Sequence, residues 1–286
     1  MRLISYQGAG ESRAAAVRDG QYVDLQQADP GLPSSMKQLL ALGADGLKRA
    51  RAAAESGRAF DPAGVKLLAP VPDPQKVLCI GLNYADHAAE SGVDPPPEPV
   101  VFCKFPTAVC AHGDAIVLPA ASSKVDYEAE LVAVIGVGGR DIPAAQALAH
   151  VAGYTCGHDV SARDWQLEKP GGQWLLGKTF DTFAPFGPEL VTADEIEDPG
   201  NLDIALRLNG ETMQDSNTRQ LIFGLPKLIE YVSSVCTLSP GDVIFTGTPP
   251  GVGAARKPPV FLKDGDLVEV EVAGVGILRN SVVAAD

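Results

Sequence analysis

The dominant pattern along this chain is a series of short apolar runs separated by turns rich in glycine and proline. Runs of this kind, bounded by such residues, are typical of β-strands. Helical patterns are fewer and cover residues 143–150 and 224–235. Because the strands do not alternate regularly with helices, the pattern predicts a β-rich α+β domain rather than a parallel βαβ series. The predicted strands lie at residues 77–81, 100–105, 115–118, 131–135, 151–157, 205–208, 242–246 and 267–272.

The first 72 residues differ in texture and predict a small N-terminal α+β appendage. Leu3–Tyr6 and Tyr22–Leu25 have the pattern of short strands on either side of a turn at residues 18–20, and residues 35–57 have the pattern of one or two helices. Prolines at positions 62, 70, 72 and 74 mark a linker. We therefore expect an appendage at residues 1–72 and a main domain at residues 73–286.

Acidic residues precede one buried strand in an alternating pattern. Asp126, Glu128 and Glu130 occupy every second position before and into the apolar run 131–135. Alternate side chains of a strand share a face, so these carboxylates would repel one another unless a positive charge lay among them. Oxygen ligands of this kind are what Mg2+ or Mn2+ prefers. The alternative is a solvated, acidic strand end.

A second acidic segment follows the apolar strand at residues 151–157. Polar residues begin at once with His158 and Asp159, and such strand ends are where active sites are built. Asp159 could complete a three-carboxylate metal site with Glu128 and Glu130, leaving positions that a chelating substrate can take. The alternative for Asp159 is a turn or N-cap aspartate.

The segment Tyr84–Glu90 predicts one or two helical turns with His87 and Glu90 three positions apart. Residues at this spacing are neighbours on a helix, and a carboxylate beside an imidazole raises its basicity, which suits activation of water. A loop with four prolines at residues 91–99 follows, so the segment is a candidate mobile lid. The alternative is an ordinary surface histidine beside a glutamate.

Two further segments are candidates for contact with a substrate. Lys178 stands alone among apolar residues, where a lysine could stabilise a developing enolate; the alternative is a surface lysine with a buried stem. Residues 246–253 follow a strand and offer backbone N–H groups and two hydroxyls on a stiff turn, suited to a carboxylate; the alternative is a purely structural turn.

Composition limits the classes of partner. The formal net charge is −13 without a basic stripe, so binding to nucleic acid or to an anionic membrane surface is not expected. No apolar run approaches the ~20 residues of a membrane-spanning helix. The five cysteines form no CxxC pair and mostly stand in apolar surroundings, which is typical of reduced core residues. With no targeting segment evident, a cytoplasmic protein is expected.

Five motifs follow one another along the chain. They are Gly-x-Asn-Tyr-x-x-His-x-x-Glu at residues 81–90, Asp-Tyr-Glu-x-Glu at 126–130, Asp-Val-Ser-Ala-Arg-Asp at 159–164, Gly-Lys-Thr-Phe-Asp at 177–181, and Thr-Gly-Thr-Pro-x-Gly-Val-Gly at 246–253. Together and in this order, they resemble the fumarylacetoacetate hydrolase family over roughly residues 74–283. The segments 173–178 and 257–263 look most like the branch of fumarylacetoacetate hydrolase domain-containing protein 2.

The resemblance implies a mixed β-sandwich roll, a homodimer, and no organic cofactor. It implies Mg2+ or Mn2+ held by Glu128, Glu130 and Asp159, with a short 2-oxo or β-dicarbonyl acid bound to the metal. The remaining implied roles follow the motifs residue by residue. Lys178 would stabilise the enolate, His87 oriented by Glu90 would activate water or move a proton, and Gln166, Thr248, Arg163 and Tyr84 would contact the substrate.

Three functions remain open at this point. The first is hydrolytic C–C cleavage of an acylpyruvate-like or fumarylpyruvate-like substrate, favoured by His87 and Glu90. The second is keto–enol tautomerisation of oxaloacetate, implied by the branch resemblance, with decarboxylation as a variant through the same enolate. The third is a non-enzymatic binding protein. Two positions depart from many members: Leu82 stands where acylpyruvate-cleaving members have arginine, and His158 where many have asparagine.

Overall fold

A long mixed sheet forms the frame of the molecule in this computed structural model, which describes residues 1–91 and 94–285. Its strand order is β4-β3-β2-β1-β14-β12-β11-β17-β6-β7, with β5 paired to β1 and β8 paired to β14. Most neighbours are antiparallel, whereas β17 with β6 and β14 with β8 are parallel. The strands are β1 (Arg2–Gln7), β2 (Ser12–Arg18), β3 (Gln21–Asp24), β4 (Ala59–Phe60), β5 (Leu67–Leu68), β6 (Val77–Gly81), β7 (Val100–Lys104), β8 (Val109–Cys110), β11 (Ala129–Ile135), β12 (Val151–His158), β14 (Ala184–Thr192) and β17 (Val243–Phe245).

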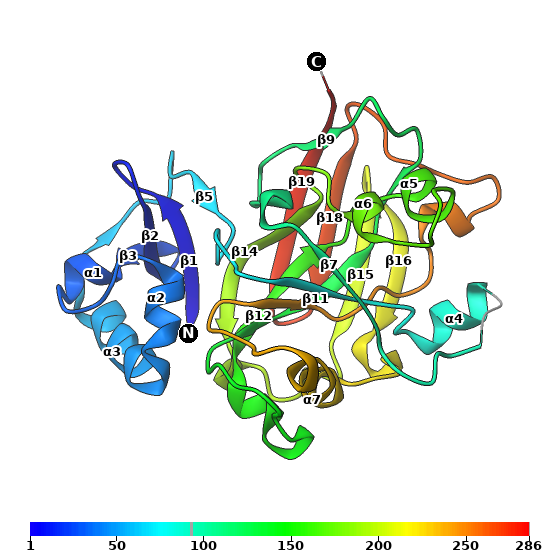
Figure 1. The fold of residues 1–286 in the computed structure, drawn as a ribbon. Helices are drawn as coiled ribbons and strands as arrows, with labels where there is room; N and C mark the ends of the chain where they lie inside the picture. The colour runs from blue at the N-terminus through cyan, green and yellow to red at the C-terminus, as the bar shows by residue number, and fades with distance from the viewer. Residues whose placement is uncertain (92–93, 286) are drawn as a thin grey trace.

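A second, five-stranded sheet packs against the long one (Figure 1). Two further strands, β10 and β13, pair with each other. The order of the five strands is β16-β15-β18-β19-β9. Two packed sheets with both parallel and antiparallel neighbours agree with the expected mixed β-sandwich. The strands are β9 (Ile116–Leu118), β10 (Val125–Asp126), β13 (Ser161–Ala162), β15 (Asp203–Leu208), β16 (Glu211–Asn217), β18 (Leu267–Val272) and β19 (Gly276–Ala284).

Strand β11 is buried on both faces, which explains its continuous apolar run. Leu131 and Ala133 point into a core cluster shared with the five-stranded sheet. Val132 and Val134 point the other way, into a cluster shared with the N-terminal helices. The alternation that the sequence predicts therefore continues through the strand, with Glu130 on the same side as Val132.

Helices are short and few among the described residues. The predicted helix at 224–235 is present as α7 (Leu225–Val235), and four of its apolar side chains, at helical spacing, enter the core. Residues 143–150 form a 3-10 helix, η2 (Ala144–His150), rather than an α-helix. No helix in the described ranges is long and apolar enough to cross a membrane. The other helices are α1 (Leu25–Ala28), α2 (Met36–Ala41), α3 (Gly43–Ser56), α4 (Ala85–Ser91), α5 (Arg163–Leu167), α6 (Leu175–Lys178), η1 (Pro106–Ala108), η3 (Ala193–Glu195), η4 (Thr218–Gln220) and η5 (Gly253–Ala255).

The N-terminal strands extend the long sheet. Strand β1 pairs antiparallel with β14, with Leu3 opposite Leu190. Met36 and Leu39 of α2 enter the same apolar cluster as Val132 and Phe245 of the main sheet. Figure 1 shows this blue segment beside the main body, with α2 and α3 on one side of its strands. The boundary proposed at residue 72 stays a prediction.

Several strands were not expected from the sequence, and each has a local reason. Strand β2 is rich in alanine, β14 contains glycine and two prolines, and β16 is mostly polar. Such residues are depleted in strands, so pairing with neighbouring strands overrides local preference there. The turn predicted at residues 18–20 is present between β2 and β3, with Asp19 and Gly20 both in the left-handed region. The predicted loop at residues 91–99 lies partly outside the described residues.

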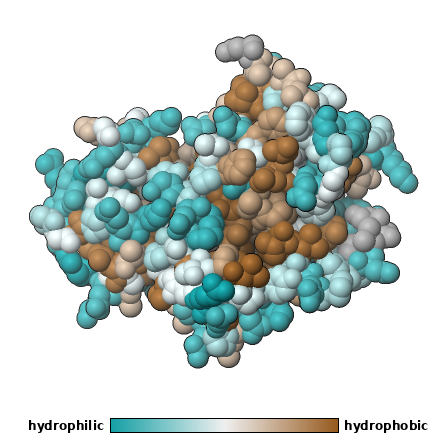
Figure 2. Space-filling view, in the orientation of Figure 1, coloured by the Kyte–Doolittle hydropathy of each residue, from teal (hydrophilic) through white to brown (hydrophobic). Residues whose placement is uncertain are grey.

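An apolar patch lies on the face shown in Figure 2, over β7 and α7. Val101 on β7 and Val235 of α7 line one shallow hollow and are exposed, Val235 by 73%. Phe105, just after β7, is also exposed. In the described sheet β7 is the final strand of the order. The patch does not by itself identify a partner, and the homodimer expected from the resemblance stays a prediction.

Candidate metal centre and active site

Three buried carboxylates converge where β11 begins and β12 ends. Glu128 directly precedes β11, Glu130 is its second residue, and Asp159 directly follows β12. The two strands pair so that Glu130 lies opposite Gly157. The Asp159 N–H donates to the Glu128 carbonyl oxygen at 3.0 Å, which fixes the junction. One oxygen from each of the three side chains lies within 4.8 Å of the others, and all three are buried. The residues that the sequence singled out as metal ligands are thus brought together.

Two lysines are buried against this acidic cluster. Nζ of Lys178 donates to Glu128 Oε2 and to Asp159 Oδ2, both at 2.9 Å. Nζ of Lys104 lies 2.6 Å from Asp159 Oδ1 and also donates to backbone carbonyls of Val160, Lys178 and Phe183. Asp159 is therefore held between two ammonium groups.

Asp126 has a different role from the two glutamates. Its carboxylate accepts from Nε of Arg163 at 2.8 Å and from the N–H groups of Gly253 and Ala254 at 2.7 and 2.9 Å. Arg163 in turn lies 2.7 Å from Glu128 Oε1. Of the three acidic residues that alternate along residues 126–130, Glu128 and Glu130 are candidate metal ligands, whereas Asp126 binds Arg163.

The charge balance of the cluster fits a cation. Four buried carboxylates, of Asp126, Glu128, Glu130 and Asp159, face three cationic side chains. Burial, reinforced by the charges of Asp159 and Glu128, raises the pKa of Glu130 well above its usual range. Burial also acts to raise the pKa of Glu128, but Lys178 and Arg163 outweigh it and hold that pKa below its ordinary value.

Glu130 is therefore the carboxylate short of positive charge. A divalent cation among the three oxygen ligands would meet that need, and Mg2+ or Mn2+ suits an all-oxygen donor set. The residues present fit such an ion.

Backbone amides of the 246–254 segment are used by the protein's own carboxylates. The N–H of Gly247 donates to Glu130 at 2.7 Å, and that of Gly251 donates to both carboxylate oxygens of Glu90 at 3.1 Å. Those of Gly253 and Ala254 hold Asp126. The sequence suggested that these amides would bind a carboxylate, but the carboxylates that four of them bind belong to this chain.

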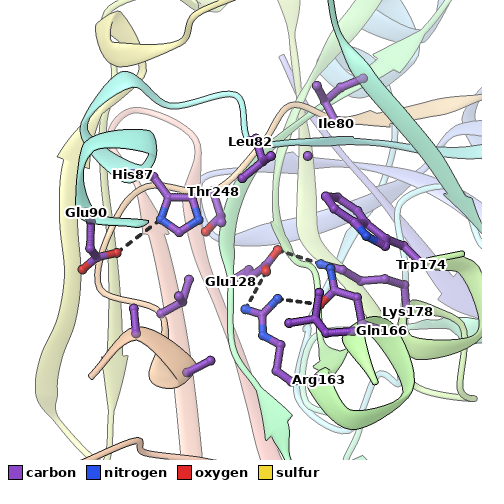
Figure 3. Close-up of a pocket in the computed structure, with 15 residues that line it drawn as sticks. Ile80, Leu82, His87, Glu90, Glu128, Arg163, Gln166, Trp174, Lys178 and Thr248 are labelled. Carbon is purple, nitrogen blue, oxygen red and sulfur yellow. Dashed lines mark hydrogen bonds and ion pairs between the residues drawn. The ribbon is translucent and has the colours of Figure 1, made fainter. Parts of the chain in front are cut away.

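A cavity of about 420 Å3 opens above Glu128. Figure 3 shows His87 and Glu90 on one side, Trp174 on the other, and Glu128 with Lys178 between them. Glu130 and Asp159 lie deeper and do not line it. The lining residues are Ile80, Gly81, Leu82, His87, Glu90, Glu128, Arg163, Gln166, Leu167, Trp174, Lys178, Thr248, Val252, Ala254 and Ala255.

The pair of His87 and Glu90 forms as expected on α4. Nδ1 of His87 lies 3.2 Å from Glu90 Oε2, and His87 is 9% exposed at the cavity wall. The helix is fastened by Asp86, which accepts from the Ser216 hydroxyl at 2.6 Å, and by the bond from Gly251 to Glu90. This pairing leaves Nε2 of the imidazole for contact with a bound molecule.

Of the four expected substrate contacts, Gln166, Thr248 and Arg163 line the cavity. Tyr84 does not. Gln166 accepts from Arg163 at 2.9 Å, and Thr248 accepts from Gln214 at 2.9 Å. Tyr84 is fully buried outside the cavity lining, and no hydrogen-bond partner of its hydroxyl is found within the described residues. Burial raises the pKa of that phenol, so it stays protonated. Its role as a substrate contact stays a prediction.

Two positioning residues were missed at the sequence level. Lys104 ends β7 and is fully buried, and a lone lysine in an otherwise apolar strand was the available signal. Gln214 accepts from the Ala129 N–H at 2.8 Å and donates to Thr248 and to the Pro249 carbonyl. It lies on the polar strand β16, where nothing in the sequence distinguishes it from a surface residue.

The family profile described as fumarylacetoacetate (FAA) hydrolase C-terminal matches residues 76–283. This chain belongs to the fumarylacetoacetate hydrolase family. Oxaloacetate tautomerase fahd2, mitochondrial, of Xenopus laevis is 48% identical over 288 residues, 99% of this chain and 90% of that protein. The family membership expected from the motifs is confirmed, and the protein is an enzyme of a family that acts on small molecules.

Solved structures confirm the fold. A crystal structure from Mycobacterium smegmatis is 41% identical and superposes with a TM-score of 0.91, with all of both chains covered. Maleylpyruvate hydrolase from Sphingobium sp. SYK-6, solved in complex with manganese (II) ion and pyruvate, is 32% identical with a TM-score of 0.83 and full coverage of both chains. A relative in this fold therefore binds a divalent metal together with a 2-oxo acid.

The expected cytoplasmic location is wrong by the same comparisons. The Xenopus laevis relative, and others of similar identity, are named as mitochondrial proteins. The expectation rested on the absence of a visible targeting segment, which is weak evidence because such segments are recognised by composition alone.

Proposed function

We propose that this protein is a metal-dependent tautomerase that interconverts the enol and keto forms of oxaloacetate. The observation that carries the proposal is the 48% identity over 99% of the chain to a relative named oxaloacetate tautomerase. It reverses the order expected from the sequence, which placed hydrolytic cleavage first. The acidic cluster and the cavity above it support the chemistry.

Glu128, Glu130 and Asp159 would hold the cation. When bound, it supplies Lewis-acid stabilisation of the developing enolate. The protein's own contribution begins with Lys178, whose ammonium group has three N–H donors. Two of them are engaged by Glu128 and Asp159, so the third is available to a substrate oxygen.

Gln166 and Thr248 also have donor groups at the cavity that bonds within the protein leave free. The side-chain oxygen of Gln166 accepts from Arg163, which leaves its NH2 group free to donate. The hydroxyl oxygen of Thr248 accepts from Gln214, which leaves its own O–H free to donate. Arg163 contributes differently, because its charge is shared between Asp126 and Glu128. It orients Gln166 and Glu128 rather than offering a free charge.

His87 is suited to move the proton. Ketonisation adds a proton at C3 of the enol and removes one from the enol oxygen, with no net gain or loss. Donation of Nδ1–H to Glu90 fixes the tautomer that leaves the Nε2 lone pair toward the cavity. Such a group can take a proton from one substrate atom and return it to another without an attacking water.

The test is an ultraviolet assay of enol-oxaloacetate decay with Mg2+, with and without EDTA, beside acetylpyruvate. We expect metal-dependent ketonisation of oxaloacetate well above the rate in buffer. Glu128→Gln is the matched variant, because it keeps the side-chain shape but weakens the ligand, and we expect it to lose the acceleration. Decay at the buffer rate with wild-type protein would refute the proposal.

Hydrolytic C–C cleavage stays the second candidate because His87 and Glu90 form a pair that also suits water activation. A hydrolase would release acetate and pyruvate from acetylpyruvate in the same assay. Release of both products with oxaloacetate unaffected would favour this candidate over the tautomerase.

A further inference from the structure

Trp174 occupies a notch that only glycine can provide. A Cβ added at Gly81 would lie 2.2 Å from Cζ3 and 2.9 Å from Cη2 of the indole, and all three nearest atoms belong to Trp174. Gly81 is not among the residues with positive φ, so its backbone would accept other residues. Space for the indole, rather than backbone conformation, therefore requires glycine at the end of β6.

A second contact fixes the same ring from the neighbouring strand. Phe102 of β7 meets Trp174 edge to face, with ring centroids 5.5 Å apart at 67°. The ammonium of Lys178 lies 5.0 Å from the centroid of Phe102. Because Trp174 is the N-cap of α6 and Lys178 ends that helix, ring and ammonium are carried on one short element. The short helix α6 therefore fixes the position of the indole relative to the Lys178 ammonium group in the cavity.

Leu82 supplies the adjoining part of the wall. It adopts a left-handed backbone with φ of 53°, which is uncommon for a residue with a side chain. The next residue, Asn83, holds it there by donating to the carbonyls of Thr246 and Phe223 and accepting from the Phe223 N–H. Figure 3 shows Leu82 between His87 and Trp174 along the rim of the cavity.

An apolar wall borders the polar floor of this cavity. Lys178, Gln166 and Glu128 lie at the floor, Trp174 closes the side away from α4, and Leu82 lies between Trp174 and His87. A 2-oxo acid held at the floor by its carboxylate and oxo groups would direct any bulky substituent on C3 against this wall. The half-buried indole is packed against Gly81 and Phe102, so it would resist displacement by such a group.

We infer that Trp174, seated against Gly81, limits the size of the 2-oxo acid that this site accepts and so selects small substrates. The inference rests on the proposed function, because it takes the substrate to be a 2-oxo acid bound at the floor. A pocket wall of this kind discriminates by about tenfold or more per added group.

The first experiment compares ketonisation of enol-oxaloacetate with that of enol-phenylpyruvate, which carries a ring on C3. We expect Trp174→Ala to raise the ratio of kcat/KM for phenylpyruvate to that for oxaloacetate by about tenfold or more. An unchanged or lower ratio would overturn the inference. If wild-type protein ketonises neither compound, the proposed function fails, and a binding measurement then decides the role of the wall.

That measurement is calorimetric binding of oxalate and of 4-phenyl-2-oxobutanoate in Mg2+. If Trp174 limits size, Trp174→Ala gains affinity for the larger ligand relative to oxalate. Equal changes for both ligands, or none, would contradict it whatever the enzyme catalyses.

Coupling between Gly81 and Trp174 gives a sharper test. Gly81→Ala is expected to impair oxaloacetate turnover in the wild-type background and to have little further effect in Trp174→Ala, where the clashing ring is absent. Gly224→Ala is the matched control, because its nearest non-bonded atom would be 3.8 Å from the new Cβ. Additive effects of Gly81→Ala and Trp174→Ala would contradict the contact as the cause.

Tryptophan fluorescence can test the contact between Trp174 and Gly81 without metal or substrate. The chain has two tryptophans, so Trp165→Phe leaves Trp174 as the sole reporter. We expect Gly81→Ala to shift the emission of that reporter and to leave the emission of Trp165 unchanged in a Trp174→Phe background. No shift of Trp174, or a shift of Trp165 as large as that of Trp174, would contradict the contact.

Discussion

The ammonium nitrogen of Lys104 lies 2.6 Å from Oδ1 of Asp159, and neither side chain is exposed to solvent. Lys104 also donates to three backbone carbonyls, one of them that of Lys178. It therefore links β7 to the end of β12 and to α6, three elements that meet beneath the cavity. Lys104 touches no cavity surface, so its effect on the reaction passes through Asp159 and Lys178.

Replacing Lys104 with methionine is expected to destabilise the fold by about 3–5 kcal/mol, because a buried carboxylate would lose a close partner. Urea unfolding in EDTA measures the change. Lys124→Met removes an exposed ion pair with Glu168 and serves as the control, with little change expected. A Lys104→Met protein as stable as the control would show that the ammonium group contributes nothing net.

Glu130→Gln is expected to stabilise the metal-free protein and to abolish its response to Mg2+. The substitution removes the carboxylate whose pKa burial and its acidic neighbours raise, and the amide oxygen can still accept from Gly247. Wild-type protein should gain about 2.7 kcal/mol at a Mg2+ concentration 100 times Kd. Thermal unfolding with Mg2+ and with EDTA compares the two proteins, and an equal Mg2+ response in both would remove Glu130 from the ligand set.

His87→Ala is expected to lower kcat for the proposed reaction by about 10²–10⁴-fold, the usual contribution of a positioned acid or base. Because His87 lies apart from the acidic cluster, the thermal response to Mg2+ should stay as in wild type. Glu90→Gln should have a smaller effect, since the imidazole remains but loses its orienting charge. A His87→Ala enzyme with full kcat would transfer the proton-moving role to another group.

Stability should depend on pH through Asp24, which ends β3 in the N-terminal part of the long sheet. Burial acts to raise its pKa, but hydrogen bonds from Arg13, Tyr6 and the Gln27 N–H lower it below the ordinary value of about 3.9. Because the pKa of Asp24 is lower in the folded protein than in the unfolded chain, ionised Asp24 stabilises the fold at pH values above its unfolded-state pKa. That stabilisation is lost as the pH falls through the folded-state pKa. Asp24→Asn should therefore be destabilising at pH 7, with a deficit that shrinks in acid.

Denaturant unfolding of wild type and Asp24→Asn at pH 7 and near pH 3 measures that difference. Tyr6→Phe removes one donor to Asp24 without removing the charge, so its deficit should be smaller. A deficit for Asp24→Asn that stays constant over this range would mean that the carboxylate charge is not the source of the stability.

The sequence predicted the acidic triad because alternation along a strand is a local property. Glu128 and Glu130 needed only a period of two, and Asp159 only the end of an apolar run. Lys104 could not be predicted in the same way, because its partner Asp159 lies 55 positions away and β11, β17 and β6 lie between β12 and β7 in the sheet order. Long-range tertiary structure, which no local pattern encodes, decides that contact.

The same distinction applies to the fold. Runs of apolar residues predicted the central strands, and helical spacing predicted α7. Strand β14 was missed because glycine and proline interrupt it, although it joins the N-terminal strands to the main sheet. The dimeric state, which depends on surfaces rather than on periodicity, stays a prediction that light scattering in solution can test.

The loop at residues 246–254 holds Glu130, Glu90 and Asp126 through main-chain donors alone. Gly247 and Gly251 have φ of 115° and 101°, and a Cβ at Gly253 would lie 1.8 Å from the Val260 carbonyl oxygen. None of these glycines carries a functional group, yet a side chain at Gly247 would disturb a candidate metal ligand, one at Gly251 the carboxylate paired with His87, and one at Gly253 the carboxylate that anchors Arg163. Substitutions of these three glycines would change positions with a purely structural role, yet we expect their measured effects to be losses of metal binding or of catalysis.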